Sequence, residues 1–157
     1  MVLIPGAVKW AAFVMIGLLL FQQLHVTKSS ATPFDAMART AQEAADLSNT
    51  VQGDNQMVRR LYGFSPSDYD GVLLFCPKTN MGAEELLLVK LKDESQEEGV
   101  LSAIGKRLET QLASFNGYGV DQTEMLEKSV TYSEGGYCLF CSGSDPVKVK
   151  NAVRNAL

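Results

Sequence analysis

Histidine is almost absent from this chain of 157 residues: the only one, His25, stands beside an apolar N-terminal segment. Residues 34–157 therefore offer no histidine for general acid–base catalysis or for metal ligation. Basic clusters are equally scarce, because no run of cations exceeds Arg59 and Arg60 and the net charge is -4. Nucleic-acid-binding proteins need a clustered positive face to neutralise phosphates. We expect no nucleic-acid partner and no histidine-based site.

Motifs for nucleotides and for serine nucleophiles are also lacking. No glycine pattern of the Walker or dinucleotide type is complete, and no Gly-x-Ser-x-Gly elbow occurs. Paired carboxylates do occur, but they perform acid–base chemistry only when burial or a neighbour separates their pKa values, and otherwise act as caps or solvated groups. The sequence predicts no cofactor and no metal, and it identifies no catalytic residue. The acidic pairs are Asp68 with Asp70, Glu84 with Glu85, and Glu97 with Glu98.

Cysteine is limited to Cys76, Cys138 and Cys141, of which the last two form a Cys-x-x-Cys spacing in GGYCLFCSG. A structural zinc site needs four ligands, which residues 34–157 do not supply at a suitable spacing. On a strand, residues three apart lie roughly 10 Å apart and point to opposite faces, so Cys138 and Cys141 cannot bond each other. Buried free thiols are the leading interpretation. A disulfide from either residue to Cys76, and a redox pair, are the alternatives.

The N-terminus carries the one long apolar segment, WAAFVMIGLLLFQQL at residues 10–24. A membrane-spanning helix needs about 20 residues, a length that residues 2–24 supply, with Lys9 reaching an interface. The alternative, a cleaved signal peptide, needs a small-residue site that QQLHVTKSSATPF provides poorly. We expect an uncleaved signal anchor over residues 1–24, inserted in the membrane through residues 2–24. A polar linker over residues 25–33 and an extracytoplasmic domain would follow.

Residues 34–157 are predicted to form a single α+β domain: a four-stranded, mostly antiparallel sheet with helices packed against it in two layers. The clearest helix carries Leu101, Ile104, Leu108, Leu112 and Phe115 in one stripe that should face the core. The run VLLFC predicts a strand covered on both faces. Helices are expected within residues 33–50, 54–61, 94–115, 121–128 and 145–157, and strands over 71–77, 85–92 and within 129–143.

Tyr62 and Tyr118 are the candidate partner-binding residues. Each precedes a glycine in an expected loop, where an aromatic ring can contact another molecule. The alternative for both is a ring packed over the edge of the domain with a solvated hydroxyl.

The chain also resembles an uncharacterised bacterial family, domain of unknown function four-three-five-eight, over residues 35–157. The resemblance depends on the LYG loop, on ELLLVKLKD before an acidic helix start, on R-x-E-x-Q-x-x-S-F-x-G-Y from Arg107 to Tyr118, and on LEK before the last hairpin. It implies a small extracytoplasmic domain of Gram-positive bacteria, held at the membrane by one helix or by a lipid. It implies no catalytic residues, and the chain lacks a cysteine after its apolar segment that could accept a lipid.

The leading functional hypothesis is a membrane-tethered, non-enzymatic binding or scaffold module of the cell envelope, with an envelope protein or a wall component as its partner. A tether raises the effective concentration of a domain for its neighbours on the membrane. The alternatives are an envelope enzyme that uses carboxylates or thiols, and a thiol redox partner acting through Cys138 and Cys141.

Overall fold

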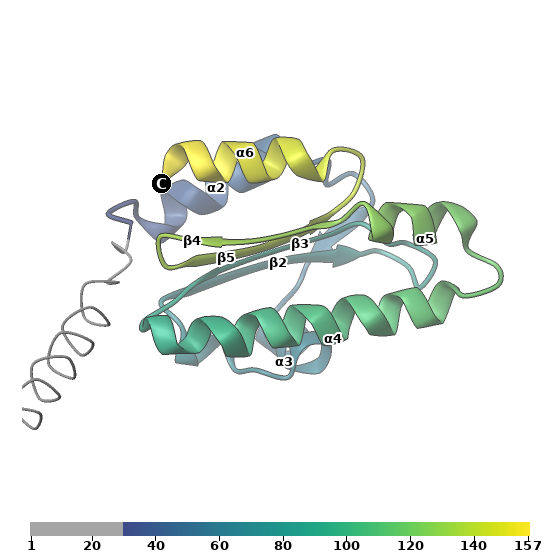
Figure 1. Cartoon of the computed structure of the whole chain (residues 1–157), viewed down its shortest axis with the longest axis horizontal. Coiled ribbons are helices and arrows are strands. Elements are labelled where there is room, and N and C mark those ends of the chain that lie inside the picture. Colours follow the sequence, from purple (N-terminus) through teal and green to yellow (C-terminus); the bar gives the residue numbers. More distant parts are fainter. Residues whose placement is uncertain (1–29) are drawn as a thin grey trace, which may run out of the picture.

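The computed structural model of the chain describes residues 30–157 (Figure 1). The predicted anchor, residues 1–24, lies outside these residues, as does most of the predicted linker over residues 25–33. Within residues 30–157, no helix combines the length and the apolar composition that crossing a membrane requires. What is described is therefore the predicted domain and the short segment before it.

A five-stranded antiparallel sheet forms the centre of the domain, in the strand order β1-β2-β3-β5-β4. The predicted α+β class and the antiparallel pairing are confirmed. The predicted number of four strands is one too few, because β1 has only three residues and is too short to show an alternating pattern. The strands are β1 (Thr50–Gln52), β2 (Gly71–Pro77), β3 (Glu85–Lys90), β4 (Val130–Glu134) and β5 (Tyr137–Ser142).

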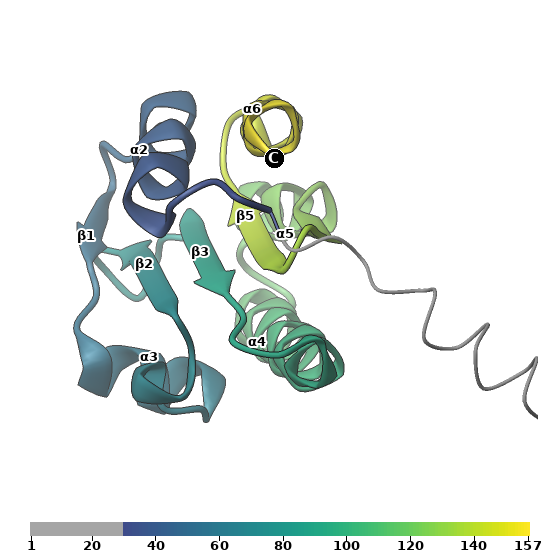
Figure 2. The same ribbon diagram turned by 90° about the vertical axis from the view of Figure 1, so that its left-hand side faces the viewer.

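Helices cover both faces of the sheet, so the domain has three layers rather than the predicted two (Figures 1 and 2). Helices α2 and α6 lie side by side on one face, α3 and α4 lie on the other, and α5 follows α4 at one end of the sheet. The apolar runs in β2, β3 and β5 require this cover on both sides. The helices are α2 (Phe34–Ala44), α3 (Asn55–Tyr62), α4 (Glu97–Phe115), α5 (Val120–Glu127) and α6 (Pro146–Ala156), with short 3-10 turns η1 (Pro66–Asp68) and η2 (Glu94–Gln96).

Two apolar clusters, one on each face of the sheet, make up most of the core of the described domain. Along β3, Leu86 and Leu88 belong to the cluster under α2 and α6, whereas Leu87 and Val89 belong to the cluster under α3 and α4. All four side chains are fully or almost fully buried. The central strand is therefore held by apolar contacts on both sides, as consecutive apolar residues predict.

The apolar stripe predicted along α4 is only partly in the core. Ile104 and Phe115 are buried, but Leu108 and Leu112 are only half-buried and pack against the small cluster at the α5 end. The buried line of the helix runs instead through Gln111, a polar residue. The predicted core-facing stripe is therefore interrupted rather than continuous: Leu112 packs against the cluster at the α5 end, and Leu108 packs against both that cluster and the one under α3 and α4.

The segment before α2 is fastened to the C-terminal end of the domain. The backbone N–H of Ser30 donates to the oxygen of Gly135 at 2.8 Å, and its hydroxyl donates to the oxygen of Leu157 at 3.2 Å. The hydroxyl of Thr32 donates to the oxygen of Ala156 at 2.7 Å. The described chain therefore begins beside its own C-terminus, at the end of the sheet that carries the β4–β5 turn.

Candidate functional site

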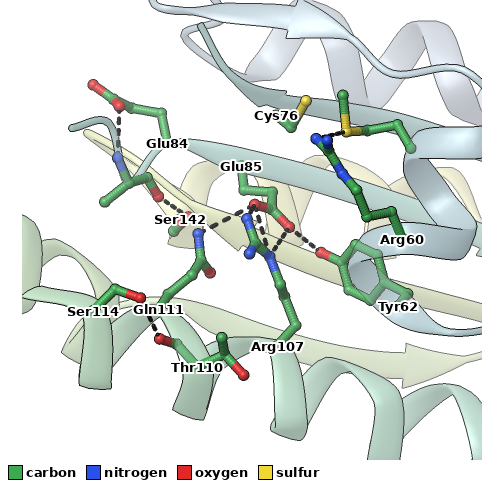
Figure 3. A network of polar contacts seen from close by, with 12 residues as sticks. Arg60, Tyr62, Cys76, Glu84, Glu85, Arg107, Thr110, Gln111, Ser114 and Ser142 are labelled. Atoms are coloured by element: carbon green, nitrogen blue, oxygen red, sulfur yellow. Dashed lines mark hydrogen bonds and ion pairs between the residues drawn. The ribbon is translucent and has the colours of Figure 1, made fainter. Parts of the chain in front are cut away.

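A buried carboxylate lies at the centre of the candidate site. Glu85 is the first residue of β3, and its side chain is fully buried. Arg107 on α4 forms an ion pair with it: Nη2 lies 2.6 Å from Oε2, and Nε donates to Oε1 at 3.1 Å. The Tyr62 hydroxyl, at the end of α3, donates to Oε1, and Nε2 of Gln111 donates to Oε2 at 3.2 Å (Figure 3). A buried carboxylate is tolerated when charge and hydrogen bonds compensate it, so this network ties α3, β3 and α4 together.

The environment keeps the Tyr62 hydroxyl protonated and Arg107 positively charged at neutral pH. Burial, and then the negative charge of Glu85, raises the pKa of Tyr62 well above its usual value, so the hydroxyl keeps its proton and donates it. Burial alone would lower the pKa of Arg107, but its hydrogen bonds and ion pair with Glu85 raise that pKa above its usual value. Arg107 is therefore a permanent cation at this position.

A pocket of about 490 Å³ opens beside the network, between α3, α4 and the β2–β3 loop. Arg60, Lys78 and Arg107 are among its lining residues, and none of the carboxylates of residues 30–157 is. Arg60 and Lys78 form no ion pair within those residues. Lys78 Nζ donates instead to the backbone oxygen of Ser48 at 2.6 Å. Arg107 reaches Glu85 with Nε and Nη2, which leaves Nη1 free of hydrogen bonds within the described part of the chain.

Part of the pocket wall, and the network behind it, come from the motifs that carry the family resemblance. Leu61 of the LYG loop lines the pocket, and the adjacent Tyr62 holds Glu85 beneath it. Glu85 begins the ELLLVK part of the second motif. The Arg107–Tyr118 run supplies a whole wall, from α4 and the turn after it: Arg107, Gln111, Ser114, Phe115 and Tyr118.

The two candidate tyrosines have different positions. Tyr62 is 6% exposed and its hydroxyl is bound to Glu85, so the prediction that it is a surface aromatic is wrong. The helix α3 extends to Tyr62, which lies one turn after the buried Val58 on the core-facing side of the helix, and Gly63 ends the helix with a left-handed backbone (φ 76°). Tyr118 is 61% exposed and lines the pocket, as a surface aromatic should. Its role in binding a partner stays a prediction.

The three cysteines are free and buried. Cys138 belongs to the core cluster under α3 and α4, and Cys141 to the cluster under α2 and α6, so the two thiols point to opposite faces of β5. Cys76 lies on β2, which β3 separates from β5. A disulfide from Cys76 to Cys138 or Cys141 would require β2 and β5 to be neighbouring strands. Because β3 lies between them, the alternative of a disulfide to Cys76 is wrong. The sequence alone does not show this strand order.

None of the three thiols has the character of a nucleophile. Burial raises the pKa of Cys138 to about 11 and that of Cys141 to about 12. Cys76 lines the pocket, but burial and then the charge of Glu85 raise its pKa as well. All three remain protonated at neutral pH, whereas thiol catalysis requires a thiolate.

Sequence reasoning alone missed the Glu85 network. The acidic pair Glu84 and Glu85 looks like two solvated carboxylates, yet the strand buries the second and leaves the first half-buried, accepting a hydrogen bond from Asn49. A usable signal does exist, because Arg107 and Gln111 are four residues apart and share one face of α4. A cation and an amide aligned with a buried helix face indicate a buried anionic partner.

Comparisons with known proteins place the site within a recognised domain. The model of a family described as Domain of unknown function (DUF4358) matches residues 43–143, a range that includes the whole Glu85 network and the pocket beside it. No curated protein and no solved structure matches the chain. Within residues 30–157, no cluster of three or more His, Cys, Asp or Glu side chains is placed to hold a metal ion.

Proposed function

Because the chain belongs to this family of unknown function, we propose a function from its own geometry: a membrane-tethered, extracytoplasmic binding module whose pocket holds an anionic group of its ligand. One observation carries the proposal. Arg60, Lys78 and Arg107 line the pocket without any carboxylate among the lining residues described, although the chain as a whole has a net charge of -4.

The three cations are suited to a carboxylate or phosphate oxygen. Arg107 is held rigidly by Glu85 and is only 14% exposed, so its remaining N–H groups are already oriented before a ligand arrives. Arg60 and Lys78 are exposed at the rim and add positive charge that also attracts an approaching anion. A fixed donor with exposed cations around it is an arrangement for binding.

The same site argues for binding rather than catalysis. Glu85 is enclosed by Arg107, Tyr62 and Gln111 and does not line the pocket, so it is not placed to exchange a proton with a ligand there. Cys76, which does line the pocket, is a protonated thiol at neutral pH. We therefore favour a non-enzymatic role over an envelope enzyme or a thiol redox partner.

The position of the pocket suits a tether at the N-terminus. Ser30 contacts the β4–β5 turn, next to the Lys90 end of β3, whereas the pocket lies at the Glu85 end of the same strand. The six residues of β3 separate the two ends by roughly 17 Å at about 3.4 Å per residue. A domain tethered through the residues before Ser30 would hold the pocket away from its attachment point.

Thermal unfolding in the presence of simple anions tests the binding function. Inorganic phosphate and succinate, each compared with chloride at equal ionic strength, distinguish a phosphate ligand from a carboxylate ligand. Binding to the folded state raises the midpoint of unfolding. We expect a rise with at least one anion, and its loss in the double variant Arg60→Ala/Lys78→Ala. The control Lys148→Ala removes an exposed cation of α6 and should keep the rise. No anion-dependent difference between wild type and the double variant would refute the proposal.

The tether needs its own test. Membranes from cells producing the full chain are washed with alkaline carbonate, and intact cells or spheroplasts are treated with protease. An integral, extracytoplasmic protein stays in the washed membranes and is digested from outside. Release by carbonate, or protection from protease until the cells are lysed, would exclude the proposed location.

A further inference from the structure

A second concavity, an apolar groove of about 920 Å³, runs along the other side of α4 between α4 and α5. Leu108 and Leu112, two half-buried residues of the predicted core stripe, form part of its wall. Val120 and Tyr118 extend the apolar surface and are 76% and 61% exposed. A soluble domain seldom leaves such residues together without a partner, so the groove has the character of a docking surface.

Gly105 gives a second and independent indication. It lies in the middle of α4 and lines the groove, and a Cβ built on it would meet no atom within 4 Å. Glycine inside a helix is less stable than alanine. No contact within residues 30–157 requires its small size, so the domain's own packing does not explain it. A glycine at an open helix surface permits the backbone of another element to come close.

The charges around the groove indicate the chemistry of the occupant. The charged residues that line it are Glu109, Glu124 and Glu127, and no lysine or arginine of the described chain is among them. Glu124 pairs with Lys128 at the surface, with 2.5 Å between Nζ and Oε1. Glu109 and Glu127 form no ion pair within residues 30–157. An apolar floor with an acidic rim is complementary to an amphipathic segment that carries cations.

We propose that this groove binds an amphipathic, basic helix of a partner protein. The apolar face of that helix packs on Leu108, Leu112 and Val120, while its lysines or arginines lie beside Glu109 and Glu127. Its backbone passes close to Gly105, where α4 presents no side chain. Helix-in-groove recognition places apolar anchors at positions i, i+4 and i+7, which matches the one-turn spacing of the two leucines. The groove adjoins the anion pocket at Phe115 and Tyr118, which line both, whereas Leu108, Leu112, Val120 and Gly105 line the groove and not the pocket.

The test uses the full chain and two synthetic helical peptides that share one apolar face, with leucines at i, i+4 and i+7. One peptide carries lysines beside this face and the other carries glutamates. Fluorescence anisotropy of the labelled peptides measures binding. We expect the lysine peptide to bind at least about tenfold more tightly than the glutamate peptide, with the difference shrinking as salt is added. Equal affinities would overturn the proposal.

Variants at Gly105 locate the contact. Gly105→Leu fills the open surface and should weaken lysine-peptide binding by about tenfold or more, in the range of a well-packed contact. Gly105→Ala should raise the midpoint of thermal unfolding and still weaken binding, so it tests the idea even if the leucine variant folds poorly. Val147→Ser, which removes an exposed apolar side chain from α6, should bind like wild type. Unchanged affinity in both Gly105 variants would overturn the proposal, as would self-association of the chain through the groove, because the occupant would then be a second copy.

Discussion

Replacing Arg107 by methionine should destabilise the domain strongly, because it leaves the fully buried carboxylate of Glu85 without its cation. Removing one partner of a buried ion pair costs about 3–5 kcal/mol. Here Glu85 would keep the hydrogen bonds from Tyr62 and Gln111. We therefore expect the free energy of unfolding to fall by about 3 kcal/mol, the lower end of that range. The total free energy of unfolding of a folded domain is only about 5–15 kcal/mol.

The double variant Glu85→Gln/Arg107→Met separates charge from packing. A glutamine at position 85 is neutral, and its amide oxygen can still accept from Tyr62. Its amide N–H can donate to Gln111 once that side-chain amide turns over, because Oε1 of Gln111 has no hydrogen-bond partner within residues 30–157. Leaving a neutral polar group imperfectly paired costs about 1–3 kcal/mol, less than an uncompensated charge. The double variant should therefore be more stable than Arg107→Met alone, although it carries one more substitution.

Urea unfolding followed by circular dichroism measures these differences as shifts of the midpoint at an unchanged slope. Lys106→Met is the matched control, because this neighbouring cation is exposed on the same helix and its loss should change stability by no more than about 0.5 kcal/mol. An Arg107→Met loss below about 1 kcal/mol would contradict the compensation argument. So would a double variant no more stable than Arg107→Met.

Three further predictions concern the thiols and the glycines. Above about pH 9 the stability of the domain should fall, because unfolded thiols release protons that folded Cys138 and Cys141 retain up to pKa values of about 11 and about 12. The stabilisation present at neutral pH is lost as the pH rises through those values, and urea midpoints that stay flat into that range would refute this. Iodoacetamide should label both thiols slowly in the native chain and rapidly in urea, and fast native labelling would contradict their burial. Gly63→Ala should cost about 1 kcal/mol for its left-handed backbone alone. Gly135→Ala should cost more, because φ is 59° and a Cβ there would also lie 3.1 Å from Leu157; equal midpoints in urea would contradict the contact.

The sequence was sufficient for the parts of the fold that depend on local pattern. Consecutive apolar residues in β2 predicted a strand covered on both faces, and the Gly135–Gly136 pair predicted the turn of the last hairpin. β1 was missed because three residues are too few to show the alternation of apolar and polar residues that marks a strand. The position of β3 between β2 and β5 could not be read from the pattern, since strand order depends on contacts between distant segments.

The candidate site was harder to predict for a related reason. Glu85 becomes a buried anion only because α3 and α4 bring Tyr62 and Arg107 to the same end of β3. The sequence around Glu85 gave no sign of this, since the adjacent Glu84 is also a carboxylate but is only half-buried and does not join the network. The exposure of Tyr118 was predicted correctly because it depends on a local loop, whereas the burial of Tyr62 depends on a carboxylate 23 residues away.

The fastening of the segment before α2 also determines how the domain would respond to pulling. A force applied at Ser30 is shared by the Gly135 turn and the last residues of α6, and the oxygen of Thr32 passes it on to Lys90 and Tyr137 in the central strands. These partners are spread along the chain from position 90 to its end, so a load at Ser30 acts on several elements at once rather than on one terminal element. We expect the domain to yield to force as a single unit, and forced unfolding to follow its unfolding rate.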